Sequence, residues 1–236
     1  MLYIVYNTWN INNLDFVRYG PAAGDSSFGS GQKSQPVELG FLLPVTKRGV
    51  GVERLRVEHT GRVFFFFDKL TFQVFYLSEV LPPDNKTSFV FYRSTMDAHD
   101  LTFVSAQINE RRRQLHFSAA TNSTSSNRTF KATHVFVATW VAAKNIWRMD
   151  STFQLVLAVD SPPLATYLLY NYGKCWWWAQ AVAVPLDQNG TYLSLSRLFT
   201  GAESNVDRPG QFIFSLFHRG IQKLKLNLKK KWVKQT

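Results

Sequence analysis

The sequence predicts a mainly β protein, built as two packed antiparallel sheets with one amphipathic helix. Aromatic residues make up 15% of the 236 residues, including 20 Phe, and large rings favour the pleated, half-buried surface of a strand. Short apolar runs bounded by polar or Gly/Pro breaks recur along the chain, as in sandwich proteins. Helical spacing of apolar residues occurs in one segment, 97–113. No repeat of 20–50 residues is evident, which argues against propellers and solenoids.

The first third of the chain reads as a loop followed by short strands. Residues 19–36 are rich in Gly, Ser and Pro and predict a loop. The expected strands are 37–43, 52–58, 63–67, 72–77 and 89–93. Apolar residues alternate only imperfectly in 52–58, whereas 63–67 is apolar throughout and suits a strand buried on both faces. Pro82-Pro83-Asp84-Asn85 breaks the chain before the last of these strands.

The segment 97–113 carries the signals of a helix. Its apolar residues recur at helical spacing, at Leu101, Val104 and Ile108. Asp97 or Thr95 can cap the N-terminus, and the arginines at 111–113 suit the negative end of the helix dipole. A polar loop is expected at 118–129, after which strands resume and continue to Phe217.

The stretch His134–Gly173 is the most informative part of the chain. It contains three strand-like apolar runs, at Val135–Val141, Phe153–Val159 and Tyr167–Tyr172. Polar or Pro-containing breaks separate them, and no residue in them is placed for catalysis.

The composition bounds the class of protein. Apolar residues make up 45% and charged residues 18%, which is typical of a folded domain with a large core. The formal net charge is +11, and six lysines lie between Lys223 and Lys234 with no acid among them. We expect a lead at 1–18, a single domain at 19–217 and a solvated basic tail at 218–236. The alternative is that this tail contacts polyanions.

The single cysteine excludes one class of scaffold without excluding secretion, and the first residues bear on the cellular location. Cys175 alone cannot form an internal disulfide, so a disulfide-stapled scaffold is excluded and a buried thiol is expected. No apolar span approaches the roughly 20 residues that cross a bilayer. The first ten residues do not resemble a signal peptide. An extracellular location would therefore imply that the sequence starts downstream of the true start or is a fragment of a longer chain.

The sequence contains no motif that carries a known chemistry. The histidines at 59, 99, 116, 134 and 218 lack the spacing of metal ligands, and the single cysteine gives a zinc site little to build from. A nucleophile elbow, a phosphate-binding loop, a dinucleotide fingerprint and an EF-hand loop are absent from the sequence. We therefore predict no catalytic residue, no cofactor site, no metal site and no enzymatic activity.

Two kinds of residue suggest interactions outside catalysis. Four Asn-x-Ser/Thr sequons in polar surroundings are candidate N-glycosylation sites, at Asn85, Asn122, Asn127 and Asn189. The rings of Trp176-Trp177-Trp178 either stack on a ligand or, as we expect, alternate across a strand with most of them in the core.

The order of several short motifs across residues 19–217 resembles the nidogen-like (NIDO) extracellular domain. The matching segments are Tyr19-Gly20 with Gly24-Asp25, Phe89–Ser94, Val137–Trp140, Ser151–Asp160, Tyr170–Gly173, Glu203–Val206 and Pro209–Phe214. The family's Pro-Phe-Trp-Ala-Asp segment has no counterpart between Phe67 and Phe89, Val182 replaces a Gly, and Val159 replaces a Thr. The first half of the domain is therefore expected to pack differently.

The resemblance implies a non-catalytic extracellular or cell-surface module in a family tied to cell–matrix adhesion. Its implied partners are matrix or cell-surface proteins and glycans, with no nucleic acid. The motif residues look like core and turn residues: we assign Trp140, Phe153 and Tyr172 to packing and Gly173, Gly201 and Gly210 to turns. The binding surface is then expected on the loops.

Two other functions stay open from the sequence. A basic β-rich domain could bind a polyanion such as nucleic acid or a heparin-like glycan, with steep salt dependence. A carbohydrate-active sandwich would need two carboxylates facing each other across a cleft.

Overall fold

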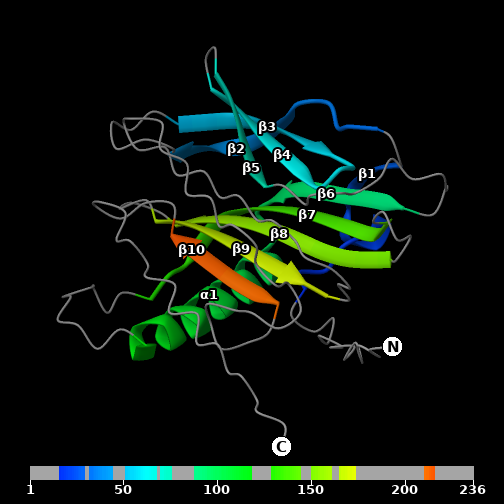
Figure 1. The fold of residues 1–236 in the computed structure, drawn as a ribbon. Helices are drawn as coiled ribbons and strands as arrows, with labels where there is room; N and C mark the ends of the chain where they lie inside the picture. The colour runs from blue at the N-terminus through cyan, green and yellow to red at the C-terminus, as the bar shows by residue number, and fades with distance from the viewer. Residues whose placement is uncertain are drawn as a thin grey trace, which may run out of the picture.

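A computed structural model describes residues 16–29, 32–44, 51–67, 70–75, 88–118, 129–144, 150–160, 165–173 and 210–215. These residues form three layers: a four-stranded sheet, a six-stranded sheet beneath it, and a helix on the far side of the larger sheet (Figure 1). The helix is α1 (Ala98–Ser118). The predicted fold class, two antiparallel sheets with one helix, is confirmed for this part of the chain.

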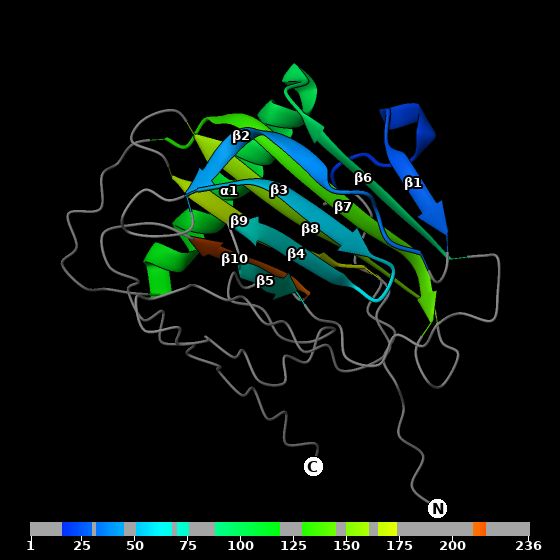
Figure 2. The same cartoon turned by 90° about the horizontal axis from the view of Figure 1, so that it is seen from above.

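All strand pairs are antiparallel. The smaller sheet runs in the order β2 (Val37–Pro44), β3 (Gly51–Glu58), β4 (Arg62–Phe67) and β5 (Leu70–Phe75). The larger sheet runs in the order β1 (Ser26–Gly29), β6 (Phe89–Thr95), β7 (Ala132–Lys144), β8 (Asp150–Asp160), β9 (Thr166–Tyr172) and β10 (Gln211–Ser215). Figure 2, seen from above, shows the smaller sheet lying over the larger one.

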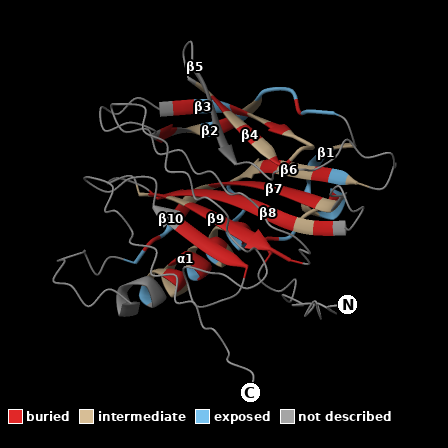
Figure 3. Ribbon diagram, viewed as in Figure 1, coloured by how far each residue is buried: buried red, intermediate tan, exposed pale blue. Residues whose placement is uncertain are grey.

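Two apolar cores separate the layers. The core between the sheets takes one face of the larger sheet, including Trp140, Phe153 and Tyr170, together with Leu55 and Phe65 of the smaller sheet. The core between the larger sheet and α1 consists of Val17, Val104, Ile108, Phe130, Ala132, Val135, Val137, Val156, Ala158, Leu169 and Ile213. Strands β7, β8 and β9 therefore contribute alternate residues to both cores. Figure 3 shows these strands as mostly buried.

This double burial explains the apolar runs of His134–Gly173. A half-exposed strand needs only every second residue to be apolar, whereas a strand covered on both faces is apolar throughout. Here one cover is the smaller sheet and the other is α1.

The prediction that the run 63–67 is buried on both faces was wrong. Val63 and Phe65 are buried, but Phe64 and Phe66 are only half-buried on the outer face of the smaller sheet. The guanidinium of Arg56 lies over both rings, 5.2 Å and 5.6 Å from their centroids. A cation–π contact of this kind lets large rings occupy an outer face.

The imperfect alternation in β3 is also present in the structure, where Val52, Leu55 and Val57 are buried. The pairing of β3 with β2 shifts register between Glu38 and Leu43, and the extra residues of this irregularity lie on β2.

The helix differs from its prediction at the C-terminal end. Asp97 caps the N-terminus as expected, since its Oδ1 accepts hydrogen bonds from the backbone N–H groups of His99 and Asp100. The helix continues to Ser118, so the arginines at 111–113 do not lie in its last turn. Arg111 is instead buried against the sheet, which corrects the expectation that these arginines serve the dipole.

The prediction of a loop throughout 19–36 was also wrong, because Ser26–Gly29 forms β1. Its backbone pairs with β6, and the Phe28 ring packs on Tyr92 with centroids 5.7 Å apart. The Ser-Ser-Phe-Gly sequence has no strand periodicity, so the pairing comes from backbone hydrogen bonds to β6 and not from local preference.

The packing roles assigned to three aromatic residues are confirmed. Trp140, Phe153 and Tyr172 are buried. Trp140 and Phe153 stack with centroids 4.9 Å apart at 11°. The indole Nε1 of Trp140 donates a 2.9 Å hydrogen bond to the Glu58 carbonyl, which links β7 to β3 across the sandwich.

The glycines predicted to lie in turns differ in the physical reason for a glycine at each position. Gly210 adopts φ +74° in a turn, as predicted. Gly173 does not have a positive φ; a Cβ there would lie 3.1 Å from the Thr152 carbonyl oxygen and 3.2 Å from Cζ of Phe16. Close approach therefore requires this glycine. Gly201 lies outside the described residues.

Several other predictions fall outside the described residues. These are the four sequons at Asn85, Asn122, Asn127 and Asn189, together with Cys175, Trp176–Trp178 and the tail at 218–236. Within the described ranges there is no helix both long enough and apolar enough to cross a membrane.

Candidate functional site

A row of buried polar side chains crosses the face of the larger sheet that carries α1. Thr139 pairs in register with Gln154, Gln154 with Asn171, and Asn171 with Gln211, so the row spans four adjacent strands. Each of these residues is at most 1% exposed. Buried amides and hydroxyls are costly unless they are hydrogen-bonded, so the partners of this row define what it does.

Gln154 binds the backbone of the segment Phe16–Asp25, which we call the strap. The Val17 N–H donates to Oε1 of Gln154 at 2.9 Å, and Nε2 of Gln154 donates to the Val17 carbonyl at 2.9 Å. The same Nε2 also donates to Oγ1 of Thr139 at 2.8 Å. One amide side chain thus satisfies both backbone groups of Val17, as a neighbouring strand would.

The strap continues across the sheet from this point. The Phe16 ring lies against Gly173 after β9, and the Tyr19 ring contacts Phe91 of β6 with centroids 6.2 Å apart. The strap then turns through a short 3-10 helix, η2 (Pro21–Ala23), and leads into β1. It therefore crosses from β9 to the β1 edge of the sheet.

A charge cluster fixes the second half of the strap. The buried guanidinium of Arg93 on β6 pairs with Asp25 through Nη1 and with Oδ2 of Asp100 on α1, the latter at 2.9 Å. Nε of Arg18 donates to the other Asp100 oxygen at 2.8 Å, and its Nη2 lies 2.6 Å from Oδ1 of Asp97. Asp25 and Asp100 are 1% exposed at the side chain, so each buried carboxylate is neutralised by a bound arginine.

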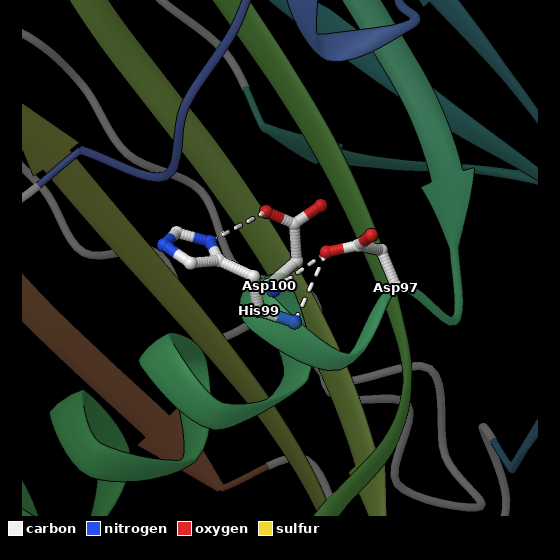
Figure 4. A group of neighbouring side chains, drawn as sticks. All are labelled: Asp97, His99 and Asp100. Carbon is white, nitrogen blue, oxygen red and sulfur yellow. Dashed lines mark hydrogen bonds and ion pairs between the residues drawn. The ribbon is translucent and has the colours of Figure 1, made fainter.

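Asp97, His99 and Asp100 have the donor types of a cation site, since one ligand atom of each lies within 4.8 Å of the others (Figure 4). Oδ1 of Asp97 and both carboxylate oxygens of Asp100 already have partners. Asp97 caps α1 and pairs with Arg18, and Asp100 binds both Arg18 and Arg93. The hydrogen bond from the Asp100 backbone N–H, followed by the charge of Arg18, lowers the pKa of Asp97. The pKa of Arg18 is raised, first by its hydrogen bond to Asp100.

Helix α1 contacts the same row of polar residues at Asn171, on the strand next to that of Gln154. Nη2 of Arg111 donates a 2.8 Å hydrogen bond to Oδ1 of Asn171, and Asn171 Nδ2 lies 3.5 Å from Oε1 of Gln154. The row, the strap and the helix thus form one connected hydrogen-bonded unit. Its chemistry is the binding of backbone amides and the neutralisation of charge.

The sequence motifs supplied most of these residues, although in a different role. Asp25, Arg93, Thr139, Gln154 and Asn171 all lie in the segments that carried the resemblance. They were assigned to core and turns, whereas the structure brings them together around the strap. A possible signal was the presence of Gln154 and Asn171 inside runs that are otherwise apolar, because a buried amide requires a specific partner.

The sequence model of the nidogen-like domain family matches residues 54–195, which is more than half of the chain. No curated protein and no solved structure matches the chain. The matched residues include the motif segments between Phe89 and Gly173. Strands β1, β2 and β10 lie outside the matched range but pair with strands inside it. The chain therefore belongs to the nidogen-like domain family.

Proposed function

We propose that this protein is a non-catalytic extracellular interaction module that contributes to cell–matrix adhesion. The observation that carries the proposal is the nidogen-like match over residues 54–195, because this family consists of extracellular modules. The proposed partners are matrix or cell-surface proteins, and glycans attached to them.

The geometry of the strap supports a structural role for the family's polar motif residues. Gln154, Asn171 and Arg93 are buried and bind other parts of the same chain. Residues engaged internally in this way hold the scaffold together. The proposed contact surface therefore lies elsewhere, on the segments between strands.

The first test is secretion. The protein is expressed from its natural transcript in animal cells, and the medium is examined for the protein and for a mass shift on enzymatic removal of N-glycans. We expect secreted protein with glycans on at least one of Asn85, Asn122, Asn127 and Asn189. Protein that stays in the cytosol without glycans would refute an extracellular module.

The second test is adhesion. Cells are allowed to attach to surfaces coated with the folded protein, with urea-unfolded protein as the control coating. We expect attachment to the folded protein alone. Complete competition by soluble heparin, with loss of attachment on replacing the lysines at 223–234 by Gln, would support polyanion binding in place of a specific adhesion surface.

A further inference from the structure

We propose that the face of β6–β9 beneath the strap is a peptide-binding site that a second copy of this chain can occupy with its own strap. We call the site residues Arg93, Asp100, Gln154 and Gly173 the strap site. In the structure the strap of the same chain fills it. The proposal goes beyond adhesion and does not depend on it.

Gln154 recognises the strap through its backbone. Its amide donates to the Val17 carbonyl and accepts from the Val17 N–H, both at 2.9 Å. These bonds use only the backbone of the strap, as in recognition of an extended peptide by a sheet edge. Thr139 and Asn171 contact the same amide and hold it in this orientation.

Side-chain contacts on both sides of Val17 select a particular peptide. Phe16 fits against Gly173, where a Cβ would approach its ring to 3.2 Å. Arg18 bonds to the buried Asp100, and Asp25 bonds to the buried Arg93. The site therefore selects an aromatic residue, then an aliphatic one, then an arginine, with an acid seven positions after the arginine.

The strap is attached to the rest of the domain as a separate unit. Within the described residues, the strap and β1 form a peripheral unit: β1 is an edge strand paired with β6, and the strap precedes every described strand. The chain after this unit is fixed separately, since Ser34 exchanges hydrogen bonds with Val57 of β3. An element at one edge of a sheet that docks on a surface built by the rest of the domain is the kind of element that copies of a chain exchange.

The occupant that fits the strap site is a second copy of this chain. The sequence that satisfies all four site residues is the strap itself, Phe16–Asp25, and its arginine and aspartate are complementary in charge to Asp100 and Arg93. An exchanged strap would make the same contacts between two chains that it makes here within one.

A complementation experiment on the full chain tests the exchange. The acceptor carries Arg18→Ala and Asp25→Asn, which weaken its own strap and leave the strap site intact. The donor carries Gln154→Leu, which weakens the site and leaves the strap intact. We expect light scattering to show a one-to-one heterodimer in the mixture and monomers for each variant alone. A mixture that stays monomeric would refute exchange between copies.

A labelled synthetic peptide of residues 16–29 keeps the proposal testable if the donor fails to fold. We expect it to bind the acceptor at least tenfold more tightly than the wild-type chain, whose own strap competes. A peptide with an N-methyl group on Val17 keeps every side chain but cannot donate to Gln154, and should bind at least tenfold more weakly. A folded acceptor that binds neither peptide, or both equally, would overturn the peptide site. If the double variant does not fold, Arg18→Ala alone serves as acceptor, because Arg18 is 43% exposed at the side chain.

Discussion

His59, directly after β3, illustrates how one buried ring nitrogen makes stability depend on pH. Its Nε2 is buried, with no hydrogen-bond partner among the described residues. Burial lowers the pKa of His59. The Gln32 carbonyl and the charge of Glu58 oppose this lowering only in part. Protonation would place a charge on a desolvated ring, so the folded state favours the neutral form.

The imidazole of His59 should lower the free energy of unfolding at acidic pH. A histidine whose folded pKa lies below its unfolded value, about 6.5, stabilises the fold fully above that value and loses the contribution as pH falls through the folded pKa. We expect the urea midpoint of the wild-type protein to fall between about pH 7 and pH 5, and His59→Gln to flatten this fall. The variant His99→Gln, which removes an exposed imidazole, shows whether loss of any histidine is sufficient. An unchanged slope in His59→Gln would contradict the prediction.

At the scale of elements, Arg93 joins the strap, β6 and α1 through its two carboxylate partners. Arg93→Met would leave Asp25 and Asp100 buried without this partner, and removing one member of a buried ion pair costs about 3–5 kcal/mol. We expect a loss of that size in the free energy of unfolding, measured by urea denaturation.

The matched control is Arg54→Met on β3. Arg54 is 58% exposed at the side chain and lies 3.9 Å from Glu38. Exposed pairs contribute at most about 1 kcal/mol, so this variant should stay close to wild type. The triple variant Arg93→Met, Asp25→Asn, Asp100→Asn should recover part of the loss because it removes the unpaired charges. Equal losses for Arg93→Met and Arg54→Met would argue against the buried cluster as a stabilising unit.

Elements with a strong local signal were predictable from the sequence, and those that depend on distant partners were not. The helical spacing of Val104 and Ile108, and the cap at Asp97, located α1. Strand β1 has no such signal, because it forms by pairing with residues 60 to 66 positions away. The site shows the same division: the motifs named Gln154, but its bond to Val17 spans 137 positions and leaves no local pattern in the sequence.

At the scale of the whole molecule, the layers predict an order of local stability. Strands β7 and β8 are central in the larger sheet and covered on both faces, whereas β1 is an edge strand with two exposed serines. We expect native-state hydrogen exchange to be slowest on β7 and β8, at the free energy of global unfolding. Amides of the strap and β1 should exchange through a smaller opening. Exchange of all these amides in a single cooperative step would show that the strap is not a separate unit.

The burial of β8 on both faces also limits which mutations this domain can accept. Every residue from Phe153 to Asp160 is buried, so no position in that run can vary as a surface residue does. On β4, by contrast, Phe64 and Phe66 are half-exposed and should accept polar replacements. A saturation mutagenesis screen for folded protein should therefore find β8 nearly intolerant and the outer face of β4 permissive. A strand with so little mutational freedom should diverge slowly, and the stretch His134–Gly173, which contains β8, lies within the residues that the family model matches.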